Sequence, residues 1–146
     1  MSACTFFGHR DCPQSVFPKL KEEIRKLIIT NKVKCFYVGN HGAFDRHVHR
    51  ALCELKKEYP AVEWYVVLAY LSKENNKSEP YKNSLYPEGI ESVPLRFAIS
   101  YRNKWMLNHS TFVITYVNRS FGGAAQFAAL AERQGKSCIK LTTGPK

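Results

Sequence analysis

Residues 33–45 read VKCFYVGNHGAFD and place an apolar run, a glycine-containing loop and the start of a helix in direct succession. The run Val33–Val38 is rich in β-branched and aromatic residues, which favour a strand. After Gly39 and Gly42, the apolar positions from Phe44 to Glu58 recur with helical spacing. Because a strand followed closely by a helix is the repeating unit of a parallel sheet, this segment indicates an α/β fold.

The same alternation continues on both sides of this segment. Further strands are expected at Ala3–Phe7, Val62–Leu71, Thr111–Val117 and Ser137–Leu141. Further helices are expected at Ser15–Thr30, at Pro94–Asn108 and from Gly122-Gly123 to Arg133. The sequence therefore predicts a Rossmann-like α/β fold with three α/β/α layers and a mostly parallel sheet of about five strands. The length of 146 residues fits a single domain over residues 1–146.

Residues 72–93 interrupt this alternation. The stretch contains Pro80, Pro87 and Gly89 among many polar residues. A long polar loop in a compact domain is often a lid or a binding loop, and a floppy insertion is the alternative. We expect a lid or binding loop here.

The composition restricts the class of protein. Apolar residues make up 45% and charged residues 23%, as in folded globular domains rather than disordered chains. No apolar run is long enough for a transmembrane helix, and the first residues do not have the pattern of a secretory signal peptide. The five cysteines are odd in number and form no CxxC pair, so we expect reduced thiols and a cytoplasmic protein.

The net charge of +10 favours anionic partners. It is equally compatible with a long nucleic acid, a small phosphate ligand or simply a soluble basic surface. No membrane partner is expected.

Glycines and small polar residues follow the expected strands at residues 8–11, 39–42, 118–123 and 142–144. In an open α/β sheet, ligands bind beyond the carboxyl ends of the strands. Glycine lets the backbone approach a ligand closely, and the start of a helix offers N–H groups to a phosphate. Gly122-Gly123, just before a helix, is the best candidate for a phosphate loop, although tight turns alone would also explain individual glycines.

Arg102 lies on the same helical stripe as Leu95, Ala98, Ile99 and Met106, so its side chain is expected to face the sheet. A buried guanidinium requires a partner because an unpaired buried charge is very costly. That partner is either a carboxylate or a ligand phosphate, and the scarcity of acidic residues nearby favours the phosphate.

Asp45 and His49 lie four residues apart and share a helix face. Two roles fit Asp45: an interaction with the helix N-terminus and acceptance of a hydrogen bond from a ribose hydroxyl. Cys12 has no identifiable base, so a nucleophilic role is disfavoured. The histidines match no metal signature, and we expect neither a metal nor a cofactor at His9, His41, His47 or His49.

Together these residues resemble the SLOG superfamily, a Rossmann-like group that includes the Lonely Guy nucleotide hydrolases and the DNA-processing A proteins. Its small stand-alone members are the most similar, and their first-strand motif resembles FFGHR at residues 6–10. Residues 39–45, followed by His49, are similar to the second-strand motif of the DNA-processing A proteins. Arg102 and Met106 match the Lonely Guy arginine motif, and Gly122-Gly123 matches the paired glycine of its phosphate loop.

One departure from the Lonely Guy pattern concerns catalysis. That pattern continues from the paired glycine to a catalytic glutamate, whereas residues 124–129 read AAQFAA and contain no carboxylate. Because cleavage of an N-glycosidic bond needs a carboxylate, we favour a non-enzymatic role and assign no catalytic residue.

The resemblance implies a protein that binds a phosphate-bearing, nucleotide-derived small molecule, either ADP-ribose-like or a cyclic nucleotide signal, as SLOG domains of antiviral systems do. We expect a stand-alone sensor or sequestering protein. The alternatives are a nucleoside monophosphate phosphoribohydrolase of Lonely Guy type and a single-stranded DNA-binding protein. The resemblance also implies a homo-oligomer, with Trp105 and Phe121 as candidate interface residues. The residues expected to bind the ligand are Gly8, His9, Arg10, Gly39, Asn40, Gly42, Asp45, Arg102, Asn103, Met106, Asn118, Gly122 and Gly123.

Overall fold

A computed structural model of the chain describes residues 2–69 and 83–142. The strands are β1 (Ala3–Gly8), β2 (Cys35–Val38), β3 (Glu63–Val67), β4 (Ser84–Leu85), β5 (Phe112–Tyr116) and β6 (Ser137–Leu141). The helices are α1 (Phe17–Thr30), α2 (Gly42–Glu58), α3 (Leu95–Asn108) and α4 (Gly123–Arg133), with short 3-10 turns at Gln14–Val16 and Ile90–Ser92. None of the described helices is both long and apolar enough to cross a membrane.

All the strands run parallel in one sheet, in the order β4-β3-β2-β1-β5-β6. The predicted Rossmann-like fold is therefore confirmed, with six strands instead of about five. The additional strand is β4, which pairs Ser84 with Val66 and Leu85 with Val67. It lies inside the segment 72–93 predicted as a lid, and two residues are too few to show a periodic pattern. Residues 72–82 of that segment lie outside the described part of the chain.

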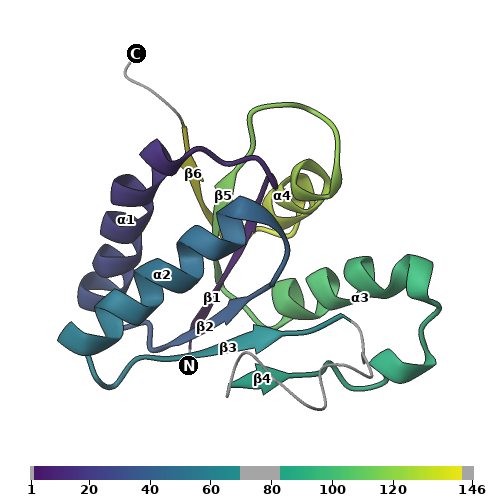
Figure 1. Cartoon of the computed structure of the whole chain (residues 1–146), viewed down its shortest axis with the longest axis horizontal. Helices are drawn as coiled ribbons and strands as arrows, with labels where there is room; N and C mark the ends of the chain where they lie inside the picture. The colour runs from purple at the N-terminus through teal and green to yellow at the C-terminus, as the bar shows by residue number, and fades with distance from the viewer. Residues whose placement is uncertain (1, 70–82, 143–146) are drawn as a thin grey trace.

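The helices form two layers, one on each face of the sheet (Figure 1). On one face, α1 and α2 bury Leu20, Ile24, Val48 and Leu52 in a large apolar core. On the other face, α3 and α4 bury a smaller cluster that includes Met106, Leu107, Phe127 and Ala131. This arrangement is the predicted α/β/α sandwich.

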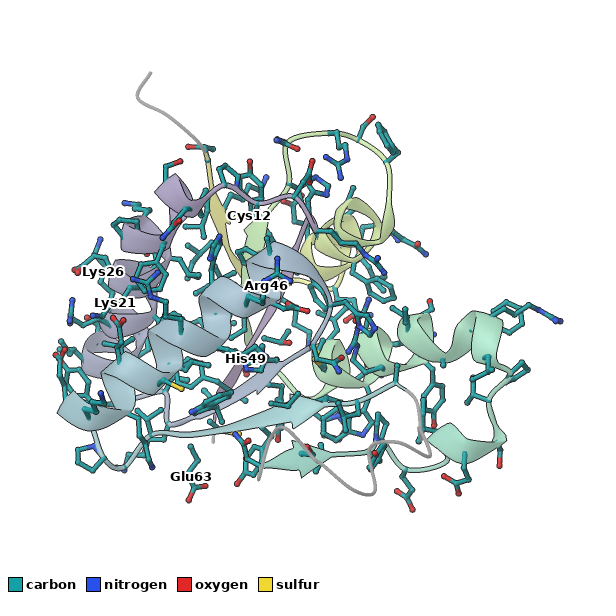
Figure 2. The ribbon with its side chains drawn as sticks, viewed as in Figure 1. Cys12, Lys21, Lys26, Arg46, His49 and Glu63 are labelled. Carbon is teal, nitrogen blue, oxygen red and sulfur yellow. The ribbon has the colours of Figure 1, made fainter. Side chains whose placement is uncertain are left out.

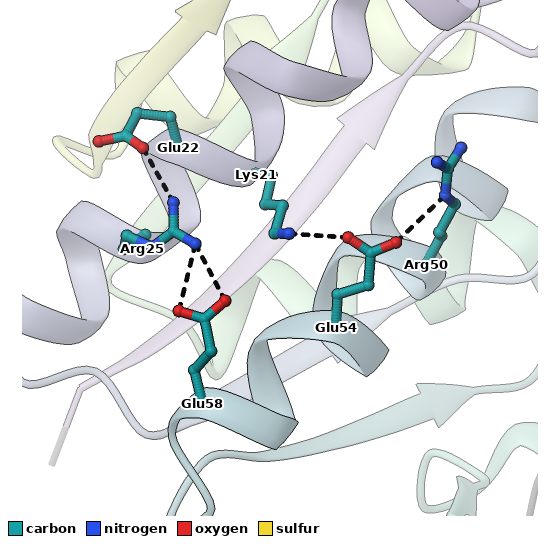
Figure 3. A network of polar contacts seen from close by, with 6 residues as sticks. All are labelled: Lys21, Glu22, Arg25, Arg50, Glu54 and Glu58. Carbon is teal, nitrogen blue, oxygen red and sulfur yellow. Dashed lines mark hydrogen bonds and ion pairs between the residues drawn. The ribbon is translucent and has the colours of Figure 1, made fainter.

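The layer of α1 and α2 is held together by ion pairs at its surface (Figure 3). Lys21 Nζ lies 2.8 Å from Glu54 Oε1, and Arg25 Nη2 lies 3.2 Å from Glu58 Oε2. These pairs use acidic residues of a chain that has only 12 of them against 22 lysines and arginines. The positive charge is consequently less compensated on other parts of the protein.

The order of the strands reverses direction at β1. The chain moves outward through β2 and β3, and then returns to β5 on the other side of β1. The helix after β1 packs on one face of the sheet and the helix after β5 packs on the other (Figure 1). The loops that follow β1 and β5 therefore diverge, and such a switch point is where open α/β sheets bind ligands.

Candidate functional site

A pocket of about 380 Å³ lies at this switch point. Four segments line it: β1 with the loop that follows, the loop after β2 with the first turn of α2, one side of α3, and the loop before α4 with the start of that helix. Ten of the predicted residues are among those that line it: Gly8, His9, Arg10, Gly39, Asp45, Arg102, Asn103, Met106, Gly122 and Gly123. A pocket of this volume is in the range of small-molecule sites.

Three predicted residues do not line the pocket. The side-chain oxygen of Asn40 accepts a hydrogen bond from Arg102, and Asn118 donates one to the hydroxyl of Tyr116. Gly42 adopts a φ of +91°, and a Cβ at this position would lie 2.7 Å from the Cα of Arg10. The sequence motifs therefore identified the loops that line the pocket. They did not identify which side chains of each loop point into it, because that depends on backbone angles that a motif does not specify.

Arg102 is 3% exposed and joins the ends of several elements. Its Nη1 donates to the carbonyl oxygen of Val67 at 3.0 Å and to Asn40 Oδ1 at 3.4 Å. Its Nε donates to Asn103 Oδ1 at 2.8 Å, and its Nη2 donates to His41 Nδ1 at 3.4 Å. The predicted inward orientation is confirmed, and these four contacts are all with uncharged acceptors. Arg102 thus adds a fixed positive charge to the pocket and also connects β3, α3 and the loop after β2.

His41 was not among the predicted ligand-binding residues, although it lies inside the quoted motif. A guanidinium only donates, so His41 Nδ1 must accept and the ring proton must sit on Nε2. Burial, together with the charges of Arg102 and Arg10, lowers the pKa of His41 to about 4. The ring is therefore neutral at physiological pH.

Asp45 is a buried carboxyl group of the pocket, with an exposed fraction of 9%. Its Oδ2 accepts a hydrogen bond from the backbone N–H of His41 at 2.9 Å. Burial raises its pKa to about 6, even though this hydrogen bond and the charges of Arg102 and Arg10 act in the opposite direction. A Cβ at Gly39 would lie 2.8 Å from Asp45 Oδ2 and 3.1 Å from Arg102 Nη1, so glycine is needed to bring these groups together.

The N-termini of α2 and α4 both reach this edge of the sheet, but they differ in how they are capped. At α2, the N–H of Ala43 donates to the carbonyl oxygen of Arg10 at 2.8 Å. No side-chain hydrogen bond from the described residues caps either helix, but at α4 no described backbone carbonyl accepts from Gly123 or Ala124 either, and Gly122 holds a φ of +99°. A Cβ at Gly122 or Gly123 would meet no atom within 4 Å. The start of α4 therefore opens into the pocket, which suits an anion.

Arg119 lines the pocket and was missed by the sequence analysis, which chose Asn118 from the same loop. Its Nη2 lies 3.3 Å from Asp11 Oδ1, so the pair connects the loops that follow β1 and β5. This hydrogen bond lowers the pKa of Asp11. The other lining residues that were missed are Phe6, Phe7, Ile99 and Ala124, which carry no polar side chain to mark them.

The remaining candidate groups have mainly structural roles. Figure 2 shows Cys12 close to the start of α2 and His49 on α2 itself. Burial raises the pKa of Cys12 to about 11, so its thiol stays protonated at neutral pH. His49 donates from Nε2 to the carbonyl oxygen of Gly39 at 2.9 Å and packs against Trp64. Within residues 2–69 and 83–142, no three His, Cys, Asp or Glu side chains are grouped to hold a metal.

Comparisons with known proteins identify a structural relative but no sequence family. No protein-family model matches the sequence, and no curated protein matches it. The fold is similar to the X-ray structure of DNA processing protein A (DprA) from Streptococcus pneumoniae, with a TM-score of 0.69 and 16% sequence identity. The match covers 96% of this chain and 50% of that chain, so this chain spans about half the length of DprA. At this identity, the likeness establishes a DprA-like Rossmann fold and nothing about the ligand.

Proposed function

We propose that the protein binds a phosphate-bearing, nucleotide-derived small molecule in this pocket, as a sensor or sequestering protein of the SLOG type. The observation that carries the proposal is the uncapped start of α4, where Gly122 and Gly123 open into the pocket. Helix N-termini of this kind combine N–H donors with a positive dipole end, which favours phosphate.

The charges around the pocket support the same proposal. Arg10, Arg102 and Arg119 line it, against Asp45 as the acidic lining residue. Asp45 has the chemistry to accept a hydrogen bond from a ribose hydroxyl, so the pocket suits the phosphoribose part that ADP-ribose-like molecules and cyclic nucleotides share. Binding is favoured over hydrolysis because residues 124–129 contain no carboxylate. We therefore expect no base release when the protein is incubated with AMP.

The test is calorimetric titration with ribose 5-phosphate, using two substitutions at one position. Gly123→Asp places a negative charge at the first residue of α4, and Gly123→Asn adds a side chain of nearly the same size without the charge. Because a Cβ at Gly123 meets no atom within 4 Å, both variants are expected to fold. The aspartate should even interact favourably with the helix dipole and leave the melting temperature unchanged or higher.

If phosphate binds at the start of α4, Gly123→Asp should abolish ribose 5-phosphate binding, and Gly123→Asn should weaken it much less. An unchanged affinity in a folded Gly123→Asp protein would rule out this location. The same titration extended to ADP-ribose and cyclic nucleotides would identify the ligand class.

A specific observation also favours single-stranded DNA as a second candidate. Most phenylalanines of the described residues are buried, yet Phe97 and Phe121 are 51% and 68% exposed. The guanidinium carbon of Arg96 lies 4.8 Å from the ring centroid of Phe97, and that of Arg119 lies 5.5 Å from the ring centroid of Phe121. Exposed aromatic rings beside cations are typical of surfaces on which single-stranded bases stack.

Fluorescence anisotropy with a labelled oligothymidylate tests this alternative. Binding through phosphates should weaken steeply as salt is raised. Replacing Phe97 or Phe121 with alanine should weaken it further, since each base stacked on a ring contributes about 1–3 kcal/mol. An oligonucleotide affinity that is independent of salt and of both rings would eliminate the candidate.

The homo-oligomer remains a prediction. Trp105, one of the proposed interface residues, stacks on His109 at 3.9 Å between ring centroids and packs against Tyr37 at 5.1 Å. These contacts give its ring an intramolecular role, so Phe121 is now the better interface candidate. Light scattering of the Phe121→Ser variant tests it, since loss of an oligomer seen with the native chain would place the interface at this loop.

A further inference from the structure

The side-chain amide of Asn103 has a fixed orientation in the pocket. Its Oδ1 faces Arg102 Nε at 2.8 Å. An arginine has no acceptor, so the atom of the amide that faces it must be the oxygen and not the nitrogen. Arg102 is itself held by the carbonyl oxygen of Val67 and by His41, which keeps the amide from turning over.

The consequence is that Asn103 turns its N–H donors toward a ligand. Its oxygen is occupied by Arg102, while its Nδ2 makes no hydrogen bond to any of the described residues. Asn103 lines the pocket, as do Ile99, one helical turn before it, and Met106, one turn after it. This side of α3 therefore combines two apolar side chains with a pair of N–H donors, and it is separate from the glycines at the start of α4.

An apolar surface with a few fixed polar groups is suited to a nucleobase, which needs contact on its faces and hydrogen bonds at its edge. Asparagine commonly recognises adenine by accepting from N6 and donating to N7. Here the oxygen already accepts from Arg102 Nε, which holds it turned toward Arg102 and leaves it one lone pair, so the N6 amino group of adenine is recognised less well than an acceptor that faces the amide N–H groups. A 6-oxopurine, as in hypoxanthine or guanine, instead presents two adjacent acceptors, O6 and N7, toward the two hydrogens of the amide.

We propose that Asn103 selects a ligand whose base is a 6-oxopurine, with the base on the α3 side of the pocket. The proposal rests on the function proposed above, in which the phosphate binds at the start of α4. Asn103 is then the residue that determines base specificity, and Arg102 is a positioning residue that acts through it.

The experiment is calorimetric titration of the native chain and its variants with IMP, AMP and ribose 5-phosphate. IMP and AMP differ in the group at position 6 of the purine, and ribose 5-phosphate has no base. The native protein should bind IMP roughly tenfold more tightly than AMP, the usual effect of one mismatched hydrogen-bonding group. Asn103→Asp keeps an oxygen for Arg102 but replaces the N–H donors with a second carboxylate oxygen, which accepts from the 6-amino group of AMP and repels O6 of IMP. The IMP to AMP ratio should therefore fall to one or below.

Asn108→Asp serves as the matched control, because Asn108 is an exposed residue at the end of the same helix and does not line the pocket. It introduces the same change of charge and should preserve the ratio. Comparing ratios within each variant cancels the general repulsion between the new charge and the phosphate.

The outcomes distinguish this proposal from the one on which it rests. If ribose 5-phosphate binds but the native chain binds IMP and AMP equally, or AMP more tightly, base selection by Asn103 is overturned and phosphate binding stands. A preference for IMP that persists in Asn103→Asp would also overturn it. If none of the three compounds binds, both proposals fail together.

Discussion

Replacing Asp45 with asparagine should make the protein more stable at neutral pH. The carboxyl group is buried, and its pKa is raised from 3.8 to about 6. A raised pKa in an acid means that the folded state binds the proton more tightly than the unfolded state does. At pH 7 the group is ionised in both states, so folding carries the full cost of burying the charge.

The magnitude follows from the pKa. A change from 3.8 to about 6 corresponds to about 3 kcal/mol, since a tenfold change in a binding constant is 1.36 kcal/mol. Asparagine avoids this cost, and its oxygen can still accept the hydrogen bond from the N–H of His41. The native protein regains the same free energy as the pH falls from about 6 to below 3.8, because the folded state becomes protonated first. The advantage of Asp45→Asn should therefore be largest at pH 7 and vanish near pH 3.

Urea unfolding of both proteins at pH 7 and at low pH measures this difference. Glu54→Gln is the control, and its effect on stability should have the opposite sign. The hydrogen bond from Lys21 lowers the pKa of Glu54, so removing this carboxylate should destabilise the protein at neutral pH. The reasoning about Asp45 is refuted if, at pH 7, Asp45→Asn unfolds at a lower urea concentration than the native chain. It is also refuted if the difference between the two is the same at both pH values.

Two further substitutions test contacts around the pocket. Arg102→Lys keeps the positive charge, but a lysine cannot reach all the acceptors of the guanidinium. Urea unfolding should therefore show a loss of stability of about 1–3 kcal/mol for each buried acceptor left unsatisfied. A lysine variant as stable as the native chain would contradict the connecting role of Arg102. Gly8→Ala places a Cβ against the buried ring of Phe44 and should cost at least about 1–3 kcal/mol of overpacking in a thermal melt. Gly123→Ala is its matched control, because a Cβ there meets no atom within 4 Å, and equal melting temperatures for the two alanine variants would show that the space at Gly8 is not tight.

The fold could be predicted from the sequence because each main element has a local pattern of its own. The segment 33–45 predicted the strand Cys35–Val38 and the helix Gly42–Glu58 within two residues at each end. The short strand Ser84–Leu85 could not be predicted, since its two residues are stabilised by pairing with Val66 and Val67 and not by any local periodicity. Local sequence contains the information for amphipathic helices and apolar strands, but not for brief pairings at the edge of a sheet.

The candidate site was predictable only as a set of loops. Helical spacing correctly placed Arg102 on the buried side of its helix, because a periodicity fixes direction. Its acceptors were not predictable, since Val67 and Asn40 come from elements far away in the sequence and one of them contributes only a backbone oxygen. Arg119 lines the pocket and the predicted Asn118 does not, because spacing in an irregular loop does not determine which side chain turns inward.

Asp45 also separates binding from hydrolysis. Asparagine places an oxygen where the carboxylate was, so a protein that uses this group only to accept a hydrogen bond from a ribose hydroxyl should keep much of its affinity for ribose 5-phosphate. Hydrolysis of an N-glycosidic bond instead needs a carboxylate to stabilise or attack the oxocarbenium-like centre, and an amide does neither. Suppose that the native chain releases base from AMP, and that the Asp45→Asn variant still binds ribose 5-phosphate but releases none. The protein would then be a hydrolase whose catalytic carboxylate lies on α2 instead of α4. If the native chain releases no base and Asp45→Asn keeps its affinity for ribose 5-phosphate, Asp45 acts as a hydrogen-bond acceptor and not as a catalytic carboxylate.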